Sequence, residues 1–152
     1  MRTVSCTVSP DNESVSSGSS TAVPVYARCT PNVYTITLNQ QSGSGGTGTI
    51  YEKYDDGYYL TYSSGAVSNK MSTSANGVTV PTRTGYTFGG YYTSTGGAGT
   101  QYIDANGKLT SSASSTQFSA NGSLYAKWTA NSYTVVYNKS NLNETGTLTS
   151  NQ

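Results

Sequence analysis

The sequence contains no histidine, only 2 cysteines and few charged residues. Without histidine, a Ser-His-Asp or Cys-His catalytic arrangement cannot form. Two cysteines alone cannot complete a four-ligand Cys/His zinc site, and no two acids stand in a motif that suggests a glycosidase pair. These absences argue against an enzyme, so we expect no catalytic residue, no metal and no cofactor.

Charge is scarce and balanced, with 8 Lys and Arg, 7 Asp and Glu and a formal net charge of +1. Nucleic acids and membrane surfaces attract clustered Lys and Arg, which are missing here. No stretch approaches the ~18 apolar residues of a membrane span, and the first ten residues lack the apolar run of a secretory signal. We expect no nucleic-acid partner and no membrane insertion; a signal and an anchor would lie outside this segment.

Tyrosine and small polar residues are abundant, with 14 Tyr against 2 Phe and 1 Trp. Aromatic and β-branched residues fit a pleated, half-buried surface. No window shows a clear 3.6-residue apolar period, and the best helix candidate, residues 63–75, carries Gly, Ser and Thr in unfavourable places. The sequence predicts a mainly β fold, with a small antiparallel or mixed sheet and at most one short helix.

Turn signals separate the short strand-like runs. Asn-Gly and Asp-Gly suit the two positive-φ positions of a type I′ hairpin turn. Four such dipeptides lie within a short stretch of the chain, namely Asp56-Gly57, Asn76-Gly77, Asn106-Gly107 and Asn121-Gly122. They predict hairpins.

The run GYTFGGYYT at 85–93 contains the clearest irregularity. Gly89-Gly90 permits a bulge, which would change whether Tyr91 or Tyr92 faces inward. The alternation in this run and in the other strand candidates predicts four core residues, Ile36, Phe88, Leu124 and Trp128.

The chain also starts over. NVYTITLN at 32–39 matches NSYTVVYN at 131–138 with an offset of 99 residues (133 − 34), and TGTI at 47–50 matches TGTL at 145–148 after a one-residue slip. Two matches in the same order indicate a tandem repeat array. We therefore divide the chain into a lead-in at 1–31, a complete module at 32–130 and the start of a second repeat at 131–152. We expect the incomplete repeat to be frayed or paired with a non-native partner.

Two long motifs carry a resemblance to a known family. The chain reads PTRTGYTFGGYYT from Pro81 and SLYAKW from Ser123, and these motifs, with the opening YTITLN, resemble the Listeria–Bacteroides repeat, also called the internalin B B-repeat. Tyr91 stands where the family has Trp, and residues around 51–76 and 98–117 are additional. The resemblance implies a β-grasp-like module of an extracellular or cell-surface bacterial protein, strung in series with neighbouring repeats. The additional residues fall where the β-grasp helix would lie.

Cys6 and Cys29 flank a serine-rich segment. They form either a disulfide or two free thiols, and an exported protein favours the disulfide. We predict a Cys6–Cys29 bridge that stabilises the fold by on the order of 3 kcal/mol.

Three further motifs are weak. Residues 43–48 match G-x-G-x-x-G, but a dinucleotide site needs a helix after the loop. Asp104, Asn106 and Gly107, and also Asp55-Asp56, resemble the start of a calcium loop but lack the further oxygen ligands. An isopeptide could use residue types present at Lys53, Lys127, Asn39 and Glu52, although their spacing does not select them. We interpret all three as structural.

The tyrosines leave two functions open. Tyr58, Tyr59, Tyr62, Tyr91, Tyr92 and Tyr102 could form an exposed platform for sugar rings, because Tyr has an apolar body and a polar tip. The same residues could simply be the core aromatics of a small β module, which we favour. The main hypothesis is a stalk or spacer; the alternative is an adhesive module that binds a host or matrix glycan or protein.

Overall fold

The computed structural model describes residues 5–9, 26–115 and 118–135. Its elements in chain order are β1 (Ser5–Ser9), β2 (Tyr26–Thr30), β3 (Val33–Asn39), β4 (Thr49–Lys53), β5 (Gly57–Ser63), β6 (Ala66–Lys70), β7 (Tyr86–Tyr92), the 3₁₀ turn η1 (Thr95–Gly97), β8 (Gln101–Ile103), α1 (Ser111–Ser115) and β9 (Gly122–Ala130). The chain is mainly β with one short α-helix in the described ranges, as predicted.

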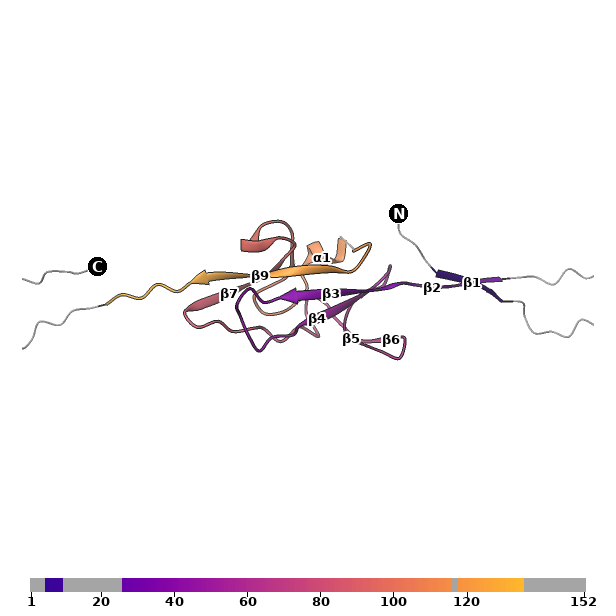
Figure 1. Cartoon of the computed structure of the whole chain (residues 1–152), viewed down its shortest axis with the longest axis horizontal. Helices are drawn as coiled ribbons and strands as arrows, with labels where there is room; N and C mark the ends of the chain where they lie inside the picture. Colours follow the sequence, from indigo (N-terminus) through magenta and orange to yellow (C-terminus); the bar gives the residue numbers. More distant parts are fainter. Residues whose placement is uncertain (1–4, 10–25, 116–117, 136–152) are drawn as a thin grey trace, which may run out of the picture.

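Seven strands form one open mixed sheet in the order β6-β5-β4-β3-β9-β7-β8. Among the described pairs in this sheet, β3 and β9 alone run parallel, with Ile36 opposite Gly122 and Asn39 opposite Tyr125. The other neighbours are antiparallel. Because β3 and β9 point the same way, the chain enters the sheet at one end and leaves it at the opposite end (Figure 1).

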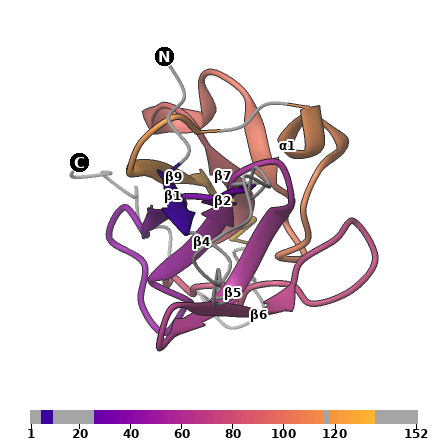
Figure 2. The ribbon, with the colours of Figure 1, turned by 90° about the vertical axis from the view of Figure 1, so that its right-hand side faces the viewer.

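The core lies on one face of this sheet. Strand alternation buries Ile36 and Leu38 of β3 and Leu124 and Ala126 of β9. The cluster is completed by Met71 and Val78 from the segment after β6, Leu109 from the segment after β8 and Ala113 of α1. The sheet twists, so its strands fan around the molecule when it is viewed along its long axis (Figure 2).

Three of the four predicted core residues are buried: Ile36, Phe88 and Leu124. Trp128 is only partly buried and packs against the cluster. The reason is its indole N–H, which donates to the Gln40 carbonyl oxygen at 2.8 Å and so holds the ring at the rim of the core.

A bulge interrupts β7, as the Gly89-Gly90 pair predicts. The register against β9 shifts between Phe88 and Tyr91, so both side chains point inward; Tyr91 is fully buried and Tyr92 half-buried. Gly90 has a φ of 109°, which disfavours any side chain. A Cβ there would also collide with the backbone oxygen of Ile103.

The turn predictions are partly right. Asp56-Gly57 ends the β4–β5 connection, and Asn106-Gly107 lies in a turn closed by the Gly107 N–H on the Asp104 oxygen. Asn76-Gly77 and Asn121-Gly122 join no hairpin; Gly122 begins β9, which pairs with the distant strands β3 and β7. The helix candidate at 63–75 is wrong, because β6 and a coil occupy it.

The ends of the described chain are extended. β1 and β2 form a two-stranded antiparallel sheet in which Cys6 lies opposite Cys29, and Cys29 is disulfide-bonded. Residues 131–135 form no strand, and Tyr133 and Val135 are exposed. The rest of the second repeat lies outside the described residues, so the fraying expected there stays a prediction.

Gly90→Ala should destabilise the module by more than about 2 kcal/mol, because the strained φ and the collision with Ile103 add together. Chemical denaturation measures the change. Gly48→Ala is the matched control, since a Cβ there meets nothing within 4 Å; equal effects of the two substitutions would contradict the bulge geometry.

Candidate functional site

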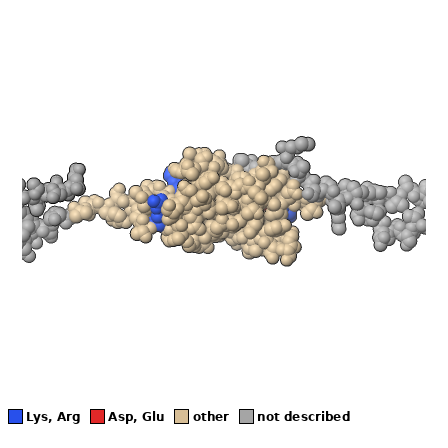
Figure 3. Space-filling model, in the orientation of Figure 1, with Lys and Arg blue, Asp and Glu red and all other residues tan. Residues whose placement is uncertain are grey.

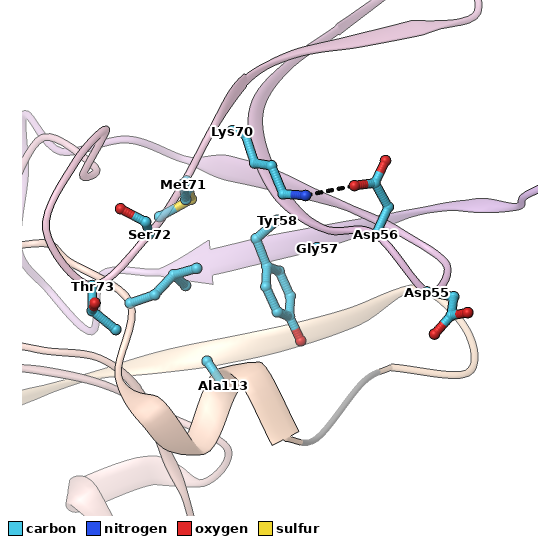
Figure 4. A pocket seen from close by; sticks show the side chains of 10 residues that line it. Asp55, Asp56, Gly57, Tyr58, Lys70, Met71, Ser72, Thr73 and Ala113 are labelled. Carbon is cyan, nitrogen blue, oxygen red and sulfur yellow. Dashed lines mark hydrogen bonds and ion pairs between the residues drawn. The ribbon is translucent and has the colours of Figure 1, made fainter.

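A hollow of about 390 Å³ lies between the β5–β6 hairpin and α1 (Figure 4). Its apolar lining comes from Tyr58, Met71, Leu109 and Ala113, and its polar lining from Asp55, Asp56, Lys70, Ser72 and Thr73. The Met71 N–H donates to the backbone carbonyl oxygen of Tyr58 at 2.8 Å, and the Leu109 N–H donates to that of Ser72 at 3.3 Å. These backbone bonds fix the walls of the hollow.

A carboxylate bound by two lysines forms the rim. Asp56 accepts from Lys53 at 2.7 Å and from Lys70 at 2.6 Å. The hydrogen bonds from Lys53 and Lys70 hold the pKa of the Asp56 carboxyl well below its ordinary value of 3.8, and the Asp56 carboxylate raises the pKa of both lysines. With Asp55 beside them, the rim holds two carboxylates and two ammonium groups, so it offers little net field to a ligand. The clamp ties the β4–β5 turn to β6.

Two shallower hollows flank Trp128, with volumes of about 430 and 440 Å³. Arg83 lies between them, its guanidinium carbon 3.8 Å from the centroid of the Tyr86 ring, and donates to the Gln41 oxygen at 3.4 Å. The Phe88 ring meets Trp128 edge-on, at 5.4 Å between centroids. These contacts engage the Arg83 guanidinium and one face of the indole, as in a structural cluster.

The tyrosines proposed as a ligand platform are mostly in the core. Tyr58, Tyr59, Tyr91 and Tyr102 are 2%, 8%, 0% and 3% exposed, so the exposed platform is wrong. Their rings supply aromatic volume to the core beside its aliphatic residues, and Tyr58 meets Tyr102 edge-on at 6.0 Å. Of the remaining two, Tyr92 is half-buried and Tyr62 is 42% exposed.

Tyr91 shows what this choice of aromatic costs. Its ring packs edge-on against Phe88 at 5.2 Å, but its buried hydroxyl has no hydrogen-bond partner among the described residues. Burial raises the pKa of this hydroxyl to about 12. A buried hydroxyl without a partner is destabilising. Tyr91 is therefore a core residue that stabilises the fold through its ring and not through its hydroxyl.

Glu52 is an isopeptide candidate by residue type, and the structure gives it a different role. It is fully buried and accepts a hydrogen bond from the Phe118 N–H at 2.7 Å. The carboxylate therefore holds the segment after α1 against the sheet. Alternation in TIYEK could have indicated its burial, because Glu52 shares a strand face with Ile50.

The other motif residues lie in structural arrangements. The loop at 43–48 leads into β4, and Ser44 pairs with Thr82. Asp104 Oδ1 accepts from the backbone N–H of Asn106 and of Lys108, at 2.9 and 2.8 Å. Of the isopeptide candidates, Lys53 pairs with Asp56 and Lys127 lies 5.7 Å from the Tyr92 ring.

Uncharged residues dominate the surface. On the face shown in Figure 3, Lys and Arg appear at few points and no Asp or Glu is visible. Across the part of the chain that the structure describes, no three His, Cys, Asp or Glu side chains gather as a potential metal site. In those same ranges no helix is long and apolar enough to cross a membrane.

Comparison with known proteins gives no relative: no protein-family model, no curated protein and no solved structure matches the chain.

Asp56→Asn should lower the free energy of unfolding at pH 7 by up to about 1 kcal/mol, the usual range of a partly exposed ion pair. A lowered carboxyl pKa stabilises the fold above the ordinary value of 3.8, and this contribution is lost as the pH falls through the lowered value. Urea unfolding at pH 7 and pH 2 measures it, and the gap between wild type and variant should shrink in acid. Asp55→Asn, at the exposed neighbour, is the control; a gap that stays constant with pH would contradict the clamp.

Proposed function

We propose that this chain is a non-enzymatic module of a bacterial cell-surface protein and serves as a stalk or spacer in a tandem array. One observation carries the proposal. The first and last strands of the module, β3 and β9, are parallel neighbours at the centre of the sheet, so the chain enters and leaves at opposite ends. A module with this geometry extends an array when it is repeated.

Both ends of the module are held by an asparagine at the same repeat position. At the first junction, the Asn32 carbonyl oxygen accepts from the Tyr54 N–H at 2.9 Å. At the second, the Asn131 N–H donates to the Gly85 oxygen at 2.8 Å, and Thr87 Oγ1 donates to Asn131 Oδ1 at 2.7 Å. These bonds fix the direction of the chain at each end, which favours a stiff connection over a flexible linker.

The order of the four central strands supports a β-grasp-like module of the internalin B B-repeat type. In β4-β3-β9-β7, the first hairpin lies beside a final strand that runs parallel to the first strand. The additional residues after β4 form β5, β6 and the coil that precedes β7, in place of a helix. An extracellular location fits the disulfide at Cys29, because disulfides persist in oxidising compartments.

Adhesion is the second candidate function, favoured by one exposed aromatic pair. Tyr62 is 42% exposed, and its ring centroid lies 5.7 Å from that of Tyr51. A sugar ring could stack on such a pair. The four buried tyrosines are removed from this hypothesis.

Single, double and triple copies of residues 32–130 test the spacer. We expect each copy to fold independently, so the melting temperature should change little with copy number, while the maximum dimension from small-angle X-ray scattering should grow linearly. A compact particle, or copies that unfold alone, would argue against a spacer.

A glycan array separates the second candidate. Specific binding that is lost in Tyr62→Ala but kept in Tyr62→Phe would favour adhesion, because phenylalanine preserves the stacking face. No binding across the array leaves the spacer as the better account.

A further inference from the structure

The internal repeat begins before Asn32. YARCTPN at 26–32 corresponds to YAKWTAN at 125–131, at the same offset that relates Tyr34 to Tyr133. Tyr26, Ala27, Thr30 and Asn32 recur as Tyr125, Ala126, Thr129 and Asn131. The strand that precedes the module and the strand that ends it therefore lie in segments that share four of seven residues.

Strand pairing follows the same correspondence. β2 pairs antiparallel with β1, and β9 pairs antiparallel with β7. Thr30 lies opposite Ser5, and its counterpart Thr129 lies opposite Thr87. At the next pair along the ladder, Cys29 lies opposite Cys6, and its counterpart Trp128 lies opposite Phe88.

The two pairs are linked in different ways, an aromatic contact in one and a disulfide in the other. Phe88 and Trp128 meet edge-on, with an interplanar angle of 61°, at the rim of a seven-stranded module. β1 and β2 form a sheet of only two strands, and an isolated two-stranded hairpin is at best marginally stable in water. An aromatic pair without a core behind it loses most of its buried area, whereas a covalent bond needs no core.

We propose that β1 and β2 are the counterpart of β7 and β9, the closing strand pair of a module, and that a Cys6–Cys29 disulfide replaces the Phe88–Trp128 contact. The inference rests on the proposed function for the idea of modules in series. Residues 26–30 are then a closing strand. The boundary between two units falls at Asn32, just after this strand, as the next boundary falls at Asn131, just after β9. The opening strand β3 would then follow the pair β1 and β2, just as the opening segment of the next repeat follows the pair β7 and β9.

Exchanging the two links in the full 152-residue chain tests this inference. In a Cys6→Ser/Cys29→Ser background, F88C/W128C should form an intramolecular disulfide in a buffer with oxidised glutathione, which takes up the two electrons and two protons that the thiols release. Thiol titration and intact mass measure the bridge, and circular dichroism checks the fold. T87C/T129C is the control. It is the next cross-strand pair along the ladder and so has the other backbone hydrogen-bonding type, and it should form the bridge several-fold less.

The reverse exchange decides the case if F88C/W128C does not fold. Hydrogen exchange of the β1 and β2 amides should be about twofold slower in C6F/C29W than in C6S/C29S, the low end of the gain from one aromatic pair, because no core lies behind these strands. Equal exchange in these two variants would overturn the inference, as would a folded F88C/W128C chain with two free thiols. Neither readout depends on how copies of the module behave in series, so failure of the spacer function is recognised separately.

Discussion

The parallel pairing of β3 with β9 is the constraint on which the rest of the module depends. On one side of it, β4, β5 and β6 follow β3 as successive antiparallel neighbours. On the other side, β7 pairs with β9, and β8 pairs with β7. On the first side the neighbours are consecutive strands, whereas on the second side β9 pairs with β7 across the residues that form η1, β8 and α1. Only the seam joins the two sides into one sheet, and the buried residues Ile36, Leu38, Leu124 and Ala126 belong to it. Bonds at its two ends reinforce it: the Thr35 N–H donates to Asn121 Oδ1 at 2.9 Å, and the Trp128 indole donates to Gln40. The same pairing directs the two chain ends apart, which is what the spacer function requires.

Local chemistry made much of this fold predictable, and long-range pairing limited the rest. Alternation identified Ile36, Phe88 and Leu124, and Gly89-Gly90 indicated a bulge, because both depend on neighbouring residues. Asn121-Gly122 failed as a hairpin signal because β9 pairs with strands far away in the sequence. A turn dipeptide describes two backbone conformations and says nothing of which strands meet. The hollow beside α1 was equally beyond the sequence, because Tyr58, Lys70 and Ala113 come from three separate segments.

Most of the tyrosines considered for a ligand platform serve as core aromatic residues. With 2 Phe and 1 Trp in the chain, tyrosine rings supply the aromatic volume of the core, and the orphaned hydroxyl of Tyr91 is a consequence. Charged residues are few in the chain, and the two ion pairs found among the described residues both involve Asp56. A weakly charged surface suits the proposed spacer, because it offers little steering field to passing partners.

Native-state hydrogen exchange of the 152-residue chain tests the role of the β3–β9 seam most directly. If the seam holds the two sides together, the amides of β3, β4, β7 and β9 should become exchangeable in one cooperative opening with the free energy of global unfolding, while the edge strand β6 exchanges earlier. Exchange of β7 and β9 in a separate opening of lower free energy, with β3 and β4 still protected, would show two independent halves and contradict this account.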